Sequence, residues 1–178
     1  MDTLESSKNI ADASKGITPL CAEEHEHSHD GHDHGFDPHI WLSPENAAKM
    51  AENIYAALIA NYPEYNDTFQ RNYLKLSEQF TALSKYADDS LSTLSCRDLI
   101  TFHDGFSYMA QAFQLNILRA IEEESGSEAS ASELISICEL IEDKHIPSIF
   151  AEKNASVSSA EIIANETGVK VFSLDMAM

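Results

Sequence analysis

The second half of the chain alternates short apolar runs with segments of helical periodicity, and this alternation restricts the fold more than any other feature. The apolar runs lie at residues 99–102, 116–121, 147–151 and 169–174. Helical patterns lie between them, through residues 108–113, about 131–144 and 158–167, where Gly168 closes the last one. Strands that alternate with helices form parallel sheets, because each helix returns the chain to the start of the next strand. We therefore predict an α/β fold with a mostly parallel four-stranded sheet flanked by helices.

The first half predicts two helices. Ser43-Pro44 is a strong helix start, because serine is a favoured N-cap and proline suits the first helical position. Apolar residues then recur at helical spacing until Pro63 interrupts the pattern. A second apolar stripe from about Tyr65 to Leu94 predicts a single helix longer than ~40 Å. A helix of that length suits a connection between two lobes.

Composition predicts four segments. Residues 1–20 contain too little apolar material for a core and are interpreted as the tail of another part of the protein. Residues 21–36 are polar and rich in His, Asp, Glu and Gly, which predicts a flexible loop. Residues 37–95 form the helical segment with the long helix, and residues 96–178 form the α/β lobe.

The charge balance limits the partners of the chain. The sequence has 11 basic and 30 acidic residues, so its formal net charge is −19. Such a surface repels nucleic acid and anionic membranes and attracts cations. No apolar stretch approaches the ~20 residues that a membrane span requires. The residues after Met1 form no signal peptide, which taken literally indicates a cytoplasmic protein.

The three cysteines do not form a recognisable motif. Cys21, Cys96 and Cys138 lie far apart and without CxxC spacing, which favours neither a disulfide framework nor a thiolate zinc site. We interpret them as buried or incidental thiols.

Histidines are concentrated between residues 25 and 44, which contain six of the eight in the chain. Five of the six alternate with Glu, Asp, Ser and Gly: His25, His27, His29, His32 and His34. This pattern offers many weak, interchangeable sites for zinc, copper or nickel, so we predict an auxiliary metal loop. The alternative is a solvated linker.

Two other histidines have surroundings typical of a built site. His39 lies in the stiff segment Asp-Pro-His-Ile-Trp, and His103 ends an apolar run before Asp104 and Gly105. Neutral imidazole is the commonest metal ligand in proteins, although a lone buried histidine is more often structural. Glu152 also follows a predicted strand, and ligands bind beyond the carboxyl ends of parallel strands. We therefore expect His103 and Glu152 to share one edge of the sheet.

Three motifs carry a resemblance to a known family. They are DPHIWLSP at residues 37–44, FHDGFSYMAQAF at residues 102–113 and IFAEKNAS at residues 149–156. With the His-rich segment and the long helix, they resemble the zinc-binding solute-binding lipoproteins of high-affinity zinc ABC importers. These belong to the metal-binding receptors of cluster A-I, which have a rigid helical backbone between two lobes. The similarity runs from about Asn9 to Met178.

The resemblance implies particular roles for individual residues. His39 and His103 map to zinc ligands of the family, whereas manganese-selective relatives place a carboxylate at the second position. Glu152 maps to the family's FxE glutamate, and with Asp37 and Asp104 it is a candidate carboxylate that orients the ligating imidazoles. The implied function is extracytoplasmic capture of Zn²⁺ and its delivery to a membrane permease, without catalysis. The implied location is the periplasm or cell surface, as a membrane-anchored lipoprotein whose relatives include cell-adhesion proteins.

Departures from the family pattern leave alternatives open. The family's complete amino-terminal lobe, its further histidine ligand, its signal and its anchoring cysteine have no counterpart here, so we interpret the chain as a fragment or truncated product. The resemblance then implies that residues 1–20 are the remnant of the amino-terminal lobe and that residues 96–178 are an incomplete carboxy-terminal lobe that binds metal. We expect weakened zinc binding and a possible homodimer through the apolar surface that the absent lobe would cover. One alternative is a free-standing zinc reservoir or chaperone that uses the His-rich loop. Another is a metal hydrolase built on His39, His103 and Glu152, for which no catalytic motif is visible.

Overall fold

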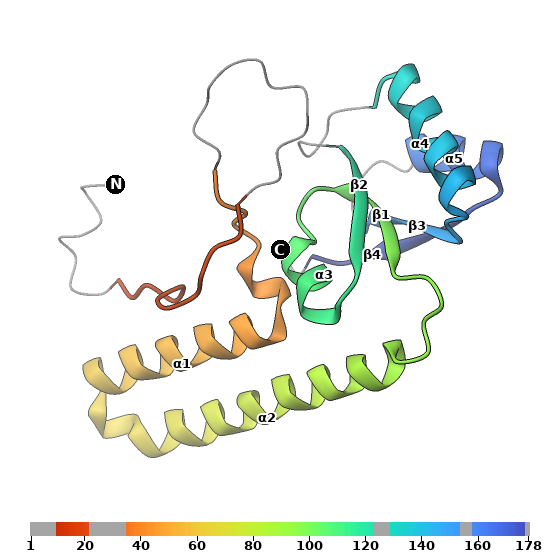
Figure 1. Cartoon of the computed structure of the whole chain (residues 1–178). Coiled ribbons are helices and arrows are strands. Elements are labelled where there is room, and N and C mark those ends of the chain that lie inside the picture. Colours follow the sequence, from red (N-terminus) through yellow and green to blue (C-terminus); the bar gives the residue numbers. More distant parts are fainter. Residues whose placement is uncertain (1–9, 22–34, 123–128, 154–157, 177–178) are drawn as a thin grey trace. The chain divides into compact units, whose positions relative to one another are not determined.

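A computed structural model describes residues 10–21, 35–122, 129–153 and 158–176 (Figure 1). The chain divides into two compact units, Met1–Ser92 and Thr93–Met178. Each unit is considered by itself below, as the first unit and the second unit. The four-segment division predicted from composition stays a prediction.

The first unit is built on a pair of helices. Helix α1 (Pro44–Asn61) begins as predicted, since the Ser43 hydroxyl accepts a hydrogen bond from the Asn46 amide at 3.4 Å. The short 3₁₀ helix η2 (Pro63–Tyr65) separates it from α2 (Asn66–Leu91). The two helices pack together, and the rings of Tyr55 and Tyr73 stack with centroids 4.9 Å apart.

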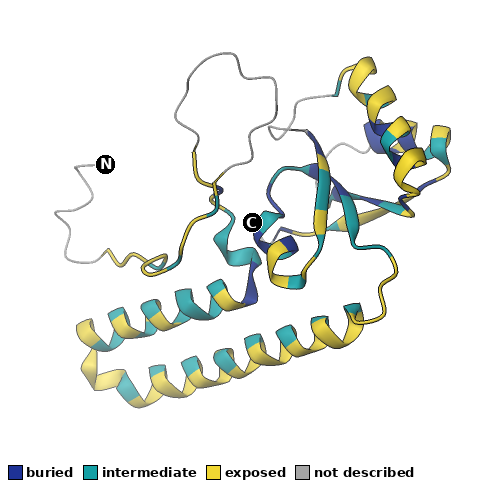
Figure 2. Ribbon diagram, in the orientation of Figure 1, coloured by how far each residue is buried: buried dark blue, intermediate teal, exposed yellow. Residues whose placement is uncertain are grey.

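Helix α2 is slightly shorter than the sequence predicted. It ends at Leu91 rather than Leu94, so its 26 residues span about 39 Å. The Ser92 hydroxyl donates to the main-chain carbonyl of Asp89 at 2.8 Å, which satisfies a carbonyl in the last turn. None of the α2 residues is buried, and Tyr86 is 70% exposed (Figure 2). The apolar stripe of α2 is therefore only partly covered by α1.

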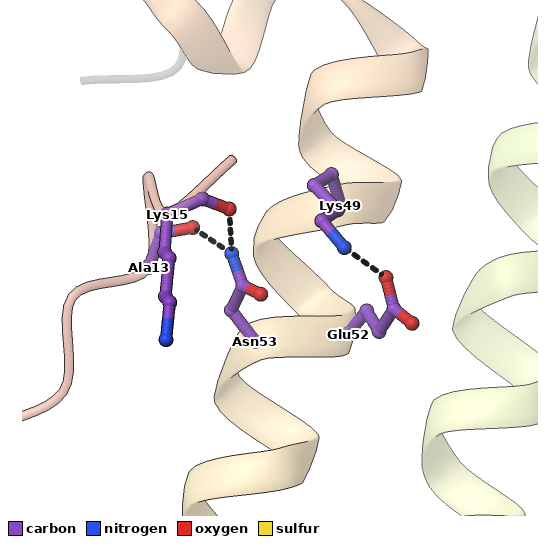
Figure 3. A network of polar contacts seen from close by, with 5 residues as sticks. All are labelled: Ala13, Lys15, Lys49, Glu52 and Asn53. Carbon is purple, nitrogen blue, oxygen red and sulfur yellow. Dashed lines mark hydrogen bonds and ion pairs between the residues drawn. The ribbon is translucent and has the colours of Figure 1, made fainter. Parts of the chain in front are cut away.

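The described part of the amino-terminal segment is fastened to α1. The Asn53 side chain donates from Nδ2 to the carbonyl oxygens of Ala13 and Lys15, both at 2.8 Å (Figure 3). These bonds hold a turn in which Gly16 adopts φ +82°, a conformation that side chains rarely tolerate. One asparagine thus joins a turn and a helix that lie about forty positions apart in the sequence.

The second unit has the predicted α/β architecture. Its strands are β1 (Asp98–His103), β2 (Asn116–Glu122), β3 (Ser148–Glu152) and β4 (Lys170–Leu174). They form a four-stranded sheet of order β2-β1-β3-β4 in which every pair is parallel. The helices are α3 (Ser107–Phe113), α4 (Ala131–Lys144) and α5 (Ser158–Thr167). The sequence predicted the class, the four strands and the parallel pairing.

The core of the second unit joins the sheet to α4 and α5. Ile100 of β1, Ile149 of β3 and Ile163 of α5 are completely buried within it. Helix α4 starts at a capping box, in which Ser130 and Glu133 each accept a hydrogen bond from the other's main-chain amide. Of the helices within the described ranges, none combines the length and the apolar character that crossing a membrane requires.

Candidate metal-binding residues

The carboxylate of Asp37 holds the His39 imidazole in one orientation. Its Oδ1 atom lies 2.7 Å from His39 Nδ1 and accepts a hydrogen bond from the His39 amide at 2.9 Å. A carboxylate only accepts hydrogen bonds, so this contact favours the neutral tautomer with the proton on Nδ1 and the lone pair on Nε2. Asp37 is only 8% exposed, so water has little access to compete with His39 for its carboxylate. This is the arrangement by which proteins present Nε2 to a metal ion.

Contacts on both sides fix the main chain around this pair. The Asp37 amide donates to the Leu20 carbonyl at 3.0 Å, and Cys21 forms an antiparallel bridge with Phe36. On the other side, the 3₁₀ helix η1 (Ile40–Leu42) leads directly into α1. The rings of His39 and Trp41 meet edge to face with centroids 5.4 Å apart. His39 therefore belongs to an ordered segment.

His103 is the last residue of β1, at the carboxyl edge of the sheet. Strand β1 lies between β2 and β3, and His103 is in register with Glu122. Thr101 is in register with Phe150, so two residues further on the parallel strands bring His103 and Glu152 to the same edge. The sequence predicted this shared edge, and it placed both residues just after their strands, whereas each is the final residue of one.

Aromatic side chains support the segment around His103. Phe102 and Phe106 are each 1% exposed, and so is Tyr108 in α3. His103 and Asp104 themselves are half-buried. Burial of the flanking side chains fixes the path of the chain past the end of β1, and it limits the positions that the imidazole can take.

The structure places the predicted site residues in different units. Asp37 and His39 belong to the first unit, and His103, Asp104 and Glu152 belong to the second. Within the described ranges, no three His, Cys, Asp or Glu side chains gather closely enough to hold a metal ion. The predicted loop ligands lie outside the described residues: His25, His27, His29, His32 and His34.

The cysteines contribute no thiolate cluster among the described residues. All three are free thiols. Cys21 is exposed, and Cys96 and Cys138 are half-buried, so of the two predicted alternatives Cys21 is an incidental rather than a buried thiol. The Cys21 thiol is exposed, although its main chain forms the bridge to Phe36.

Sequence reasoning missed the contribution of Leu20. Its carbonyl accepts the hydrogen bond that anchors Asp37. Every residue has a main-chain carbonyl, so the amino-acid sequence gives no sign of such a contact. The closeness of Asp37 to His39 was visible, because an aspartate readily bonds the main chain two residues later.

The model of one protein family matches almost the whole chain. The family is described as zinc-uptake complex component A, periplasmic, and its model matches residues 1–177. The zinc-binding lipoprotein AdcA of Streptococcus pneumoniae serotype 4 is 34% identical over 176 residues, which cover 96% of this chain and 35% of that protein. A putative metal-binding protein of Treponema pallidum is 30% identical over 166 residues, which cover 90% of this chain and 52% of that protein.

Solved structures agree with this assignment. The crystal structure of ZnuA superposes with a TM-score of 0.82 and 31% sequence identity, covering 94% of this chain and 63% of that one. A laminin-binding protein of Streptococcus agalactiae, described as bifunctional with adhesin and metal-transporting activity, gives a TM-score of 0.76 at 25% identity, over 93% of this chain and 60% of that one. The present chain thus spans about a third of AdcA and about three fifths of the solved chains. The resemblance carried by the three sequence motifs is confirmed, and the chain belongs to the family of the periplasmic zinc-uptake component A.

Proposed function

We propose that this chain is part of an extracytoplasmic receptor that captures Zn²⁺ and delivers it to the permease of an ABC-type importer. The match of residues 1–177 to the zinc-uptake family carries the proposal. Solved relatives include Zn(II)-bound variants of AdcAII from Streptococcus pneumoniae. The relatives named here are binding and transport proteins, so the proposal includes no catalytic step. It also places the receptor at the membrane surface outside the cytoplasm, in line with the words periplasmic and lipoprotein in those names.

His39 and His103 are the proposed zinc ligands of this chain. Imidazole nitrogen is a preferred zinc ligand, and the Asp37 carboxylate already selects the tautomer of His39 that presents Nε2. His103 gains support from its position at the carboxyl edge of a parallel sheet, where ligands of α/β proteins bind. Asp104 and Glu152 are proposed as carboxylates that orient His103 rather than as ligands. The reservoir and hydrolase alternatives gain no support from the relatives.

The first prediction concerns the tightest zinc site of the full chain. We expect His39→Ala and His103→Ala each to weaken its affinity at least about tenfold, since each removes one ligand. Competition with a chromogenic chelator measures the affinity. His145→Asn is the matched control, because His145 is exposed at the end of α4 with φ 53°, which asparagine tolerates. Circular dichroism of each variant checks that the fold is retained.

Two results would refute the assignment of ligands. One is an unchanged affinity in a folded variant that carries both His39→Ala and His103→Ala, which would leave the His-rich loop as the tight site. The other is an equal loss of affinity in the His145→Asn variant, which would reveal a general effect of histidine number.

The His-rich loop is proposed to increase the local concentration of zinc. Deletion of residues 23–35 should lower the number of zinc ions bound per chain and leave the tightest affinity unchanged. Isothermal titration calorimetry gives both quantities in one experiment. An unchanged number of bound ions would contradict this role.

We also propose that the chain forms a homodimer through the first unit. An apolar groove of about 500 Å³ runs between α1 and α2, and we name it the α1–α2 groove. Ile54 and Leu76 line it and are 46% and 39% exposed. Two helical hairpins that place such grooves face to face form a four-helix arrangement, which covers the apolar side chains of both copies.

A further inference from the structure

A second groove lies in the second unit, between α4 and α5. We name it the α4–α5 groove; it encloses about 410 Å³. Its apolar part includes Ile135 of α4 and Ile162 of α5, which are 61% and 48% exposed. The core already receives Ile137 and Ile141 from α4, both nearly completely buried. Ile135 and Ile162 therefore form an apolar surface that the fold of this unit does not use.

The groove has the length of a short helix. Its lining positions on α4 extend from residue 131 to residue 142, which corresponds to about 16 Å along the helix axis. Residues 162 and 166 of α5 form the opposite wall and lie one helical turn apart. Exposed faces of both helices are visible in Figure 2. A groove of about three turns suits an amphipathic helix whose apolar side chains enter it one turn apart.

The charge of the groove selects the chemistry of its occupant. Glu139, Glu142 and Glu166 line it, and no Lys, Arg or His is among the lining residues that the structure describes. The pKa of the Cys138 thiol in the groove is raised, first by burial and then by the charges of Glu166 and Glu142. The negative potential of the glutamates thus reaches the apolar part of the groove. Anionic lipid and nucleic acid are repelled by such a surface.

A second copy of the chain is also a poor match to this groove. The sequence contains 30 acidic and only 11 basic residues, so another copy would bring mostly like charge to the three glutamates. We infer that the α4–α5 groove docks a cationic amphipathic helix of another protein. Its apolar side chains contact Ile135 and Ile162, and its Lys or Arg side chains pair with the glutamates. This interaction is separate from the zinc ligands.

Titration with a model peptide tests the inference. The probe is a synthetic helix of Leu and Lys at amphipathic spacing, about three to four turns long, added to the full chain with a zinc chelator present. We expect Ile135→Lys to weaken binding at least about tenfold, because it removes the apolar contact that Ile135 would make with the peptide and adds a charge that the Lys side chains of the peptide repel. Leu74→Lys is the matched control, since Leu74 is 52% exposed on α2 and the change in charge is identical. Its affinity should stay within about twofold of the wild type.

Cys138 serves as a reporter inside the groove. The bound peptide should slow alkylation of Cys138 and leave alkylation of the exposed Cys21 unchanged, as measured by mass spectrometry of the digested protein. A peptide with Glu in place of Lys should neither bind nor protect.

Several results would overturn the proposal. They are equal binding of the Glu peptide, equal loss of affinity in Leu74→Lys, unchanged affinity in Ile135→Lys, or absence of binding at low salt. Self-association of the chain that Ile135→Lys abolishes would assign the groove to a second copy, and would equally overturn it.

Discussion

At the scale of single residues, the pair Asp37 and His39 shows how a carboxylate two positions away can fix the orientation of an imidazole. The same carboxylate oxygen binds the His39 amide and faces its Nδ1 atom. The first contact fixes the main chain, and the second fixes the tautomer of the ring. Because Asp37 is buried, its charge is poorly screened by water.

Asp37→Asn should weaken zinc binding while leaving the turn intact. The amide oxygen can still accept from the His39 amide, but the negative charge that faces the Nδ1 atom is lost. Changes of such outer partners typically reduce metal affinity about 10- to 100-fold. Chelator competition measures the change.

Asp12→Asn provides the matched control for this prediction. Asp12 Oδ1 accepts hydrogen bonds from the Ser14 amide at 2.9 Å and the Ser14 hydroxyl at 2.6 Å, so it forms the same kind of turn with no histidine. The pKa of Asp12 is lowered by these bonds, which shows that its carboxylate is also engaged. Equal affinities of Asp37→Asn and the wild type would argue against an orienting role.

At the scale of elements, the turn at Ala13–Gly16 depends on α1. Two hydrogen bonds from one Asn53 amide hold it, and Gly16 supplies the conformation that closes it (Figure 3). Lys49 and Glu52 of the same helix form an exposed ion pair at 2.7 Å, which contributes little to stability. The attachment of the turn therefore rests on Asn53.

Asn53→Ala should release this turn. The loss of two hydrogen bonds costs about 1–3 kcal/mol of local stability, so trypsin should cleave after Lys15 several-fold faster. Time-resolved mass spectrometry measures the rate at that bond. Glu52→Ala changes the neighbouring residue without removing either bond, and it should leave the rate unchanged. Equal rates for Asn53→Ala and the wild type would show that other contacts hold the turn.

At the scale of the whole molecule, a charge of −19 and exposed apolar grooves act in opposite directions on self-association. Repulsion between copies weakens with added salt, whereas apolar contacts do not. Dimerisation through the α1–α2 groove should therefore strengthen as sodium chloride is added.

Ile54→Lys should shift the chain from dimer to monomer. It places a charge in the α1–α2 groove, so the dissociation constant should rise at least about tenfold. Sedimentation velocity with a zinc chelator present measures it. Leu83→Lys is the control, because Leu83 is 48% exposed on α2 but does not line the groove. A wild-type chain that stays monomeric at all concentrations, or an equal effect of both variants, would exclude this interface.

The local sequence determined the elements of this protein, because each rests on contacts between near neighbours. Periodicity and capping residues predicted α1, α4 and α5 and the four strands, and Asp-Pro-His predicted the carboxylate beside His39. The three motifs predicted the family.

Only the tertiary structure decided the properties that depend on packing between distant segments. Strand order β2-β1-β3-β4 arises from pairing across helices, and it makes β1 and β3, which end in His103 and Glu152, direct neighbours in the sheet. The exposure of Ile135 could not be read from α4 alone, because an apolar helix residue is buried only where another element covers it. Sequence thus determined which residues can bind or pack, and the packing of the chain decided which of them remain exposed.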